Sequence, residues 1–303
     1  MNILLTGASG FIGRHVTTRS SIKRVVVRSR TASNTSSQFE IDTLNGATNW
    51  NGAFSGIDAV IHLAGLAHSH RFSEQEYQSV NVDGTLHLAQ EAFNAGVRRF
   101  VFVSSIGVNG TSTANEPFTP ASLPAPHNEY AQSKYRAELK LKQLAAETGL
   151  ELVIVRPTLV YGPGAPGNFG MLTQLVKRVP ILPFGCANNR RDFIAVQNLA
   201  DLLVECAKHP SAAGHTFLAS DGKAMSTKEL TKAIANGVGS SLIQLPVPVF
   251  IMKILGKIVN KSAMIDQLYG NLEVDSSQLQ KVLDWVPSMT VKQVMQSFNE
   301  NNQ

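Results

Sequence analysis

The chain has 303 residues, with 27 Lys and Arg against 22 Asp and Glu, and 43% of its residues are hydrophobic. These values are typical of a globular protein and exclude intrinsic disorder, fibrous repeats and low-complexity sequence. With two cysteines and no Cys/His pairs at zinc spacing, neither a disulfide framework nor a metal site is predicted. No run of 18 uninterrupted apolar residues occurs, so no membrane span is predicted.

The net charge of +5 is spread along the chain, except that residues 1–30 carry six basic residues and no acid. This local excess favours a phosphate-bearing small ligand over nucleic acid. The apolar run Met1–Thr6 has no basic residue before it and stops at Gly7, which argues against a signal peptide. Together with the low cysteine count, this predicts a reducing, cytoplasmic location.

Short apolar runs alternate with helical patterns over the first 160 residues. Strands are predicted at Ile3–Leu5, Val25–Val27, Phe39–Ile41, Ala59–His62, Phe100–Val103 and Leu152–Val155, and helices at Ile12–Ser20, Ser79–Asn94 and Tyr130–Thr148. This alternation predicts an α/β fold, namely a Rossmann-type doubly wound parallel sheet with a smaller C-terminal α/β substrate lobe. We expect residues 1–163 and 190–222 to form the dinucleotide-binding domain, and 164–189 and 223–303 the lobe.

The strongest local signal is the segment Thr6–Gly13, which follows the first strand and opens the first helix. Its glycines Gly7, Gly10 and Gly13 allow a tight turn, close approach of a pyrophosphate and close helix–strand packing. The same segment carries Phe11 and Ile12. It therefore predicts a dinucleotide site at the end of the first strand.

The end of the second strand bears on which nicotinamide cofactor binds. A carboxylate there would bind the ribose 2′-hydroxyl of NAD, whereas this chain has Arg28 and Arg30. Guanidinium groups suit a 2′-phosphate, so NADP is favoured over NAD. The alternative is that both arginines lie on a solvated strand end.

Three residues further along form a catalytic pattern. Ser105 follows an apolar strand, and Tyr130 and Lys134 lie four apart on one face of a predicted helix. A nearby ammonium group favours the phenolate and would lower the pKa of Tyr130, which makes it a base near neutral pH. Ser105 can bind the same substrate oxygen.

Together these motifs resemble the extended short-chain dehydrogenases/reductases, specifically the nucleotide-sugar epimerases and reductases that include the UDP-galactose and UDP-N-acetylglucosamine 4-epimerases. The resemblance spans essentially the whole chain. It includes the three glycines, the segments 61–65 and 81–85, the Ser105–Tyr130 interval, Arg156–Pro157, Tyr161–Pro163 and Arg191–Ile194.

The resemblance implies roles for further residues. Asp42 and Thr43 would border the adenine, Leu63, Ala64 and Gly65 would line the nicotinamide side, and Lys134 would also hold the nicotinamide ribose. The substrate, a UDP-sugar, would meet Ser105, Tyr130, Asn168, Leu182 and Arg191, with Asn168 and Arg191 at the diphosphate. A homodimer formed through helices near 79–94 and 130–148 and a role in polysaccharide biosynthesis are also implied.

The chain also departs from the family pattern. Leu159 stands where an Asn is frequent, and a second diphosphate-binding Arg is missing around 263–268. Ile106 and Gly107 after Ser105 offer no acid or base, so dehydration is disfavoured. Two reactions remain: 4-epimerisation of a UDP-hexose or its N-acetyl form through a 4-keto sugar, which we favour, and NADPH-dependent reduction of a 4-keto nucleotide sugar. A dinucleotide-sensing regulator without catalysis is a remote third possibility.

Three histidines and one basic stripe have simpler interpretations. His62 is expected in the core or beside the cofactor, and His68 and His70 in a polar loop. Lys253, Lys257 and Lys261 recur beside apolar residues within a helix predicted near 247–260. This stripe suits either an anionic membrane surface or, as we expect, burial of its apolar side in the smaller lobe.

Overall fold

The computed structural model describes residues 1–28, 37–67 and 71–300, and for 299 and 300 only the backbone. Within these residues, seven parallel strands form one sheet in the order β10-β6-β5-β4-β1-β2-β3. Their bounds are β1 Ile3–Thr6, β2 Ile22–Arg28, β3 Gln38–Ile41, β4 Ala59–His62, β5 Arg99–Val103, β6 Glu151–Pro157 and β10 Thr216–Ala219. The predicted Rossmann-type sheet is confirmed, with its strand order reversing between β1 and β4.

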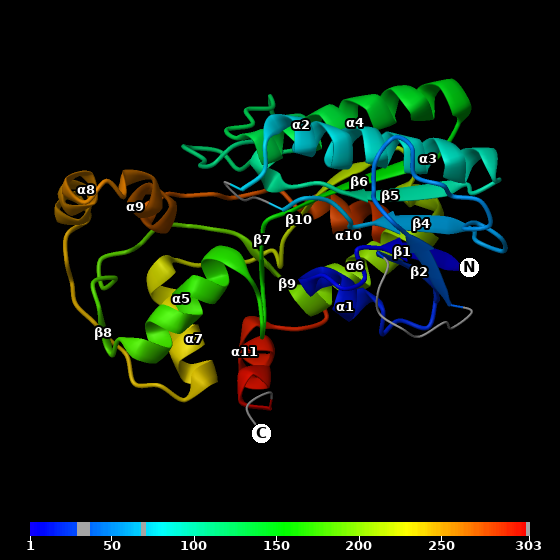
Figure 1. Ribbon diagram of the computed structural model, residues 1–303. Helices are drawn as coiled ribbons and strands as arrows, with labels where there is room; N and C mark the ends of the chain where they lie inside the picture. The colour runs from blue at the N-terminus through cyan, green and yellow to red at the C-terminus, as the bar shows by residue number, and fades with distance from the viewer. Residues whose placement is uncertain (29–36, 68–70, 301–303) are drawn as a thin grey trace.

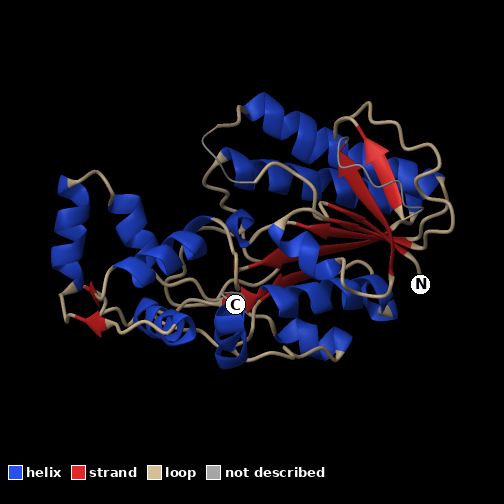
Figure 2. Ribbon diagram, turned by 60° about the horizontal axis from the view of Figure 1, so that its bottom comes forward, coloured by secondary structure: helices blue, strands red, loops and turns tan. Residues whose placement is uncertain are grey.

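Helices cover both faces of this sheet, as Figures 1 and 2 show. One face packs against α3 and α4, with α2 beside them, and the opposite face packs against α1, α6 and α10. The strands alternate between the two layers: Ile3 and Leu5 belong to one core and Leu4 to the other. Such alternation of apolar residues on both sides is what a sheet buried on both faces requires. The helices are α1 Phe11–Val16, α2 Glu74–Tyr77, α3 Gly84–Asn94, α4 Glu129–Thr148, α6 Val196–Lys208 and α10 Ser277–Leu283.

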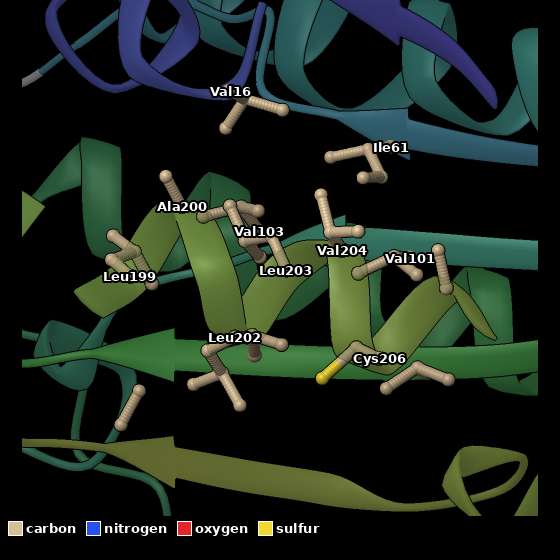
Figure 3. Close-up of a cluster of buried hydrophobic side chains, with 14 of the residues drawn as sticks. Val16, Ile61, Val101, Val103, Leu199, Ala200, Leu202, Leu203, Val204 and Cys206 are labelled. Atoms are coloured by element: carbon tan, nitrogen blue, oxygen red, sulfur yellow. The ribbon is translucent and has the colours of Figure 1, made fainter. Parts of the chain in front are cut away.

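Helix α6 provides the apolar surface of one layer. Figure 3 shows Leu203 and Val204 of α6 among Ile61, Val101 and Val103 of the sheet. All five side chains are buried, and burying a side chain of this size typically contributes about 1.5–3 kcal/mol. This layer holds β1, β4 and β5 in place, and the strand ends that carry the candidate site extend from them.

Two predicted helices differ from the expected bounds. The first was expected to reach Ser20 but ends at Val16, where the hydroxyls of Thr17 and Thr18 donate to the carbonyls of Arg14 and His15. The second begins with a π-helical turn, Gln78–Asp83, before α3. A π-helical turn holds one more residue than an α-helical turn, which apolar periodicity does not reveal.

The smaller lobe packs around a core of its own, which includes Phe169, Phe184 and Tyr269. In Figure 1 the helices α8 and α9 lie at its far end from the sheet. A two-stranded pair, β7 Leu159–Tyr161 with β9 Phe193–Ala195, lies between lobe and sheet. The lobe elements are α5 Gly167–Arg178, β8 Ile181–Leu182, α7 Thr227–Val238, β11 Ile243–Gln244, α8 Val249–Ile258, α9 Ser262–Tyr269 and α11 Val291–Glu300. Outside the lobe, three short helical turns lie at Gln78–Asp83, Ile106–Val108 and Pro210–Ala212.

In the part of the chain that the structure describes, no helix is both long and apolar enough to cross a membrane. Nor do three or more His, Cys, Asp or Glu side chains gather there at a spacing suited to a metal ion.

Candidate functional site

The turn after β1 has the conformation expected of a dinucleotide cradle. Gly7 has φ +73°, and its carbonyl accepts a hydrogen bond from the Gly10 amide at 3.0 Å. A Cβ on Gly13 would lie 2.1 Å from the Gly7 carbonyl oxygen, and one on Gly7 would lie 2.8 Å from the Ala64 nitrogen. Both positions therefore require glycine. Without side chains there, the turn can be tight and a pyrophosphate can approach its backbone closely.

A buried histidine ties the ends of β1 and β4 together. His62 Nδ1 lies 2.7 Å from Thr6 Oγ1, and its Nε2 lies 2.9 Å from Thr85 Oγ1 on α3. Thr6 Oγ1 in turn accepts from the Ala64 amide at 3.1 Å. Burial, and secondarily the charge of Lys134, lower the pKa of His62 to about 3, so this histidine is neutral. It fixes the two strand ends between which the cofactor is expected.

Ser105, Tyr130 and Lys134 come together at the same edge of the sheet. Ser105 follows β5, and helix α4 is started by Asn128, whose Oδ1 accepts from the Ala131 amide at 2.8 Å. A hydrogen bond joins the side chains of Ser105 and Tyr130. One turn later, Lys134 donates to the Val103 carbonyl at 3.0 Å, and its ammonium lies 4.8 Å from the Phe102 ring centre.

The electrostatics of Tyr130 differ from the expectation. Burial raises the pKa of Tyr130 to about 12, although the hydrogen bond with Ser105 acts in the opposite direction. Burial also lowers the pKa of Lys134 to about 8, while the charge of Glu138 raises it. Desolvation disfavours the charged form of each group, so the pKa of Tyr130 lies above its ordinary value and not below it as expected. At neutral pH the side chain of Tyr130 is therefore a neutral hydroxyl.

Asn81 is a candidate positioning residue that the motifs alone did not single out. Its Oδ1 accepts from the Leu66 amide at 2.7 Å, and its Nδ2 donates to the Leu66 carbonyl and to Ser133 Oγ. Asn81 thus joins the loop after β4 to helix α4. A Cβ on Gly65 would lie 2.8 Å from Asn81 Oδ1 and 3.6 Å from Lys134 Nζ, so Gly65 faces both. The sequence analysis included Asn81 in the family-like segment 81–85, but nothing in that segment indicated that its side chain joins the loop after β4 to helix α4.

The candidate adenosine end lies at the edge formed by β2 and β3. Arg28 is the last residue of β2 and pairs in register with Ile41, so the exposed Asp42 and Thr43 follow next to it. Arg28 itself is exposed. Arg30, predicted to share its role, lies outside the described residues, as do His68 and His70.

The candidate substrate residues lie in or next to the smaller lobe. Asn168 is exposed in the first turn of α5, and Leu182 is buried on β8. Arg191 precedes β9 and is bridged to Met225 and Leu272, and its Nη1 donates to the Gly270 carbonyl at 3.1 Å. Burial lowers the pKa of Arg191 to about 10, so its guanidinium stays charged at neutral pH.

Comparison with known proteins agrees with this geometry. Residues 3–219 match the model of the NAD dependent epimerase/dehydratase family. The chain belongs to this family. A UDP-glucose 4-epimerase of Vibrio cholerae is 38% identical over 99% of this chain and 96% of its own length.

Solved structures share the fold of this epimerase/dehydratase chain. One is a UDP-glucose 4-epimerase from Thermotoga maritima with UDP-glucose, with a TM-score of 0.75 and 22% identity over the full length of both chains. Another is RMD from Pseudomonas aeruginosa complexed with NADPH, with a TM-score of 0.73 and 23% identity over 99% of both chains. The family match and the 38% identity to a UDP-glucose 4-epimerase confirm the resemblance to the nucleotide-sugar epimerases.

A cavity of about 400 Å³ lies outside the groups described above. Its lining includes Asp192, Ser220, Asp275 and Trp285, and none of the predicted site residues. Burial raises the pKa of Asp192 to about 6, and its Oδ2 accepts from the Val274 amide at 2.8 Å. The wall also holds Glu273, Asp275 and Arg190, whose Nε donates to Glu273 at 2.8 Å, so acidic side chains outnumber basic ones, which disfavours the cavity as a diphosphate site.

Proposed function

We propose that this chain is an NAD(P)-dependent nucleotide-sugar epimerase that inverts C4 of a UDP-hexose or a UDP-N-acetylhexosamine through a 4-keto intermediate. The observation that carries the proposal is that Ser105, Tyr130 and Lys134 lie together at the edge of the sheet where β1 and β4 end. The 38% identity to a UDP-glucose 4-epimerase over nearly the whole chain supports the same reaction.

The glycine turn fits a dinucleotide, because it is so tightly packed that side chains at Gly7 and Gly13 would collide with backbone atoms, and such a tight turn allows close approach of a pyrophosphate. Gly7, Gly10, Phe11 and Ile12 would hold the diphosphate end, and Leu63, Ala64 and Gly65 the nicotinamide end. A bound oxidised nicotinamide supplies a hydride acceptor and a positive charge. Held beside Tyr130, that charge would favour the phenolate and would oppose the desolvation that raises the pKa of this phenol to about 12.

Tyr130 then has two tasks in the proposed reaction. Its oxygen takes the proton of the C4 hydroxyl as the C4 hydride leaves, and it returns that proton when the hydride comes back to the other face of the ketone. Ser105 donates a hydrogen bond to the same C4 oxygen, and Lys134 stabilises the negative charge on the phenolate. Because the sugar loses and regains the same proton and hydride, the proposed reaction needs no added oxidant or reductant.

The decisive experiment is incubation of the purified protein with UDP-glucose and with UDP-N-acetylglucosamine, followed by separation of the C4 epimers. We expect inversion of at least one of them with no more than one equivalent of dinucleotide per site. Absence of C4 inversion on either substrate, in protein shown to hold the cofactor, would overturn the assignment.

The second candidate function is NADPH-dependent reduction of a 4-keto nucleotide sugar. It is favoured by Arg28, the basic residue at the end of β2 where an acidic residue would bind NAD. This reaction consumes one NADPH for each sugar reduced. Loss of NADPH absorbance in proportion to a 4-keto sugar, without inversion of UDP-hexoses, identifies it.

We also propose NADP as the preferred cofactor, because the basic Arg28 ends β2.

We further propose a homodimer as the working unit, with α3 and α4 at the contact between subunits. Leu139, which is 50% exposed on α4, supports this contact because it leaves a large apolar side chain in water. Light scattering after size exclusion should give twice the chain mass for the wild-type protein and one chain mass for Leu139→Lys. A monomeric wild-type protein would contradict the dimer.

A further inference from the structure

Helix α8, at the end of the smaller lobe, leaves its apolar side chains in water. The exposed fractions are 64% for Phe250, 54% for Ile254, 47% for Leu255 and 71% for Ile258. Burial of this side within the lobe was the expectation, and it is wrong. The apolar surface of α8 is therefore available to a partner.

The exposed residues share one side of the helix. At about 100° per residue, Phe250, Ile251, Ile254, Leu255 and Ile258 fall within an arc of roughly 140°. The packed side is different: Gly256 is buried, and a Cβ there would lie 2.7 Å from Ile265 of α9. Since α9 already occupies the packed side, the apolar arc is not the face by which α8 is held in the fold.

The two charged residues on α8 itself are both basic. Lys253 and Lys257, both exposed, lie along one border of the arc, and the exposed Lys261 follows the helix. Residues 230–265 contain no Asp or Glu, and the next acid along the chain is the exposed Asp266 on α9. Lysine side chains beside an apolar arc can keep their ammonium groups at the level of lipid headgroups while the apolar side enters the acyl region.

Neighbouring segments extend the same character. Ile243, 59% exposed, and Leu245, 46% exposed, lie on the chain that leads into α8, and Met264 of α9 is 51% exposed. In Figures 1 and 2, α8 and α9 lie at the end of the lobe away from the sheet. A flat surface can approach them there without meeting the sheet or the helices that cover it.

We propose that α8 docks this protein on an anionic membrane surface, with Phe250, Ile254 and Ile258 entering the boundary between headgroups and acyl chains and Lys253 and Lys257 binding anionic headgroups. Charge complementarity selects this partner. A second copy of this chain would place one cationic border against another, and an apolar protein groove would not use the lysines. This inference does not depend on the proposed reaction, because the helix lies outside the candidate site.

The test is co-sedimentation of the full chain with vesicles of phosphatidylcholine alone and of phosphatidylcholine with 30% phosphatidylglycerol. We expect binding to the anionic vesicles and little to the neutral ones. Lys253→Gln/Lys257→Gln should weaken binding roughly 25-fold, from about fivefold per lysine near an anionic surface. Phe250→Gln/Ile254→Gln/Ile258→Gln should abolish it while leaving the circular dichroism spectrum and C4 inversion unchanged.

The matched control is Lys142→Gln/Lys208→Gln, which removes the same charge from exposed positions on α4 and α6 and should leave binding unchanged. Equal loss in this control would show only a general charge effect and overturn the role of α8. Absence of wild-type binding to anionic vesicles would overturn it as well. A dimer that the triple variant converts to monomer, without vesicle binding, would instead assign the surface to a second copy.

Discussion

The carboxylate of Glu138 accepts two hydrogen bonds from the guanidinium of Arg156, at 2.9 Å from Nε and 2.5 Å from Nη2, and both side chains are almost completely buried. Glu138 also accepts from Ser104 Oγ at 2.5 Å. The carboxylate therefore connects the strand end that carries Ser105, the helix that carries Tyr130 and Lys134, and strand β6. This arrangement fixes the positions of Ser105, Tyr130 and Lys134 relative to one another.

Replacing Glu138 should destabilise the fold strongly. Glu138→Gln leaves the Arg156 charge buried without its partner, which costs about 3–5 kcal/mol in the free energy of unfolding. Urea unfolding measures this loss, with the exposed Glu147→Gln on the same helix as the control. A change below about 1 kcal/mol would contradict the role of the pair. In any folded variant, the pKa of Lys134 should fall further, because the charge of Glu138 raises it.

Tyr130→Phe should remove activity while keeping the fold. The phenyl ring preserves the packing against Tyr77, but no oxygen remains to take the proton from the C4 hydroxyl. The expected loss in kcat is roughly 10²-fold or more, the size of a lost general base. Tyr135→Phe, the same change on the same helix, serves as the control. Near-normal turnover of Tyr130→Phe would exclude Tyr130 from the proton transfer.

Gly13→Ala should impair dinucleotide binding. The added methyl group would lie 2.1 Å from the Gly7 carbonyl and 2.8 Å from the Ala8 Cα, so the turn must open. We expect a loss of cofactor affinity of tenfold or more by calorimetric titration and a destabilisation of about 1–3 kcal/mol from overpacking. At Gly46 the nearest atom is the Asp83 Cβ at 3.8 Å, so Gly46→Ala should bind normally. Equal affinities of the two variants would refute the cradle.

Arg28→Asp should change the cofactor preference. If Arg28 binds the 2′-phosphate, the loss of a charge-assisted hydrogen bond costs about 1.5–3 kcal/mol, or ten- to a hundredfold in NADP(H) affinity. NAD(H) affinity should be spared or improved. Lys23→Asp, a charge reversal at an exposed position earlier in the same strand, should alter neither affinity selectively. A wild-type protein that binds both cofactors equally would contradict the preference for NADP.

His62 should make stability depend on pH. Its pKa is about 3 in the fold and about 6.5 unfolded, so between these values the unfolded chain binds the extra proton. The stability contribution of neutral His62 is complete above pH 6.5 and decreases as the pH falls towards 3, by about 2 kcal/mol between pH 6.5 and 5. The difference between wild type and His62→Gln in urea unfolding isolates this effect from Asp192, whose raised pKa acts in the opposite direction. A difference that stays constant over this pH range would refute it.

The sequence allowed the sheet and the candidate catalytic residues to be predicted because both depend on local patterns. Apolar runs indicated the strands, and the spacing of Tyr130 and Lys134 placed them on one side of α4. The Glu138–Arg156 pair has a separation of 18 residues and no motif, so only the packing of α4 against β6 reveals it. The exposure of α8 was predicted wrongly for a similar reason: periodicity shows that a helix has an apolar side, and not whether another element covers it.

The π-helical turn before α3 limits how this part of the chain can change in length. Its extra residue sets the rotation of everything that follows on the same helix. Removing a single residue between Gln78 and Asp83 would rotate α3 by about 100° about its axis. Leu88 and Ala92, now buried against the sheet, would swing away from it, and Thr85 would leave His62. A change of length here therefore disrupts the core unless the π-helical turn itself absorbs it by closing to an α-helical turn.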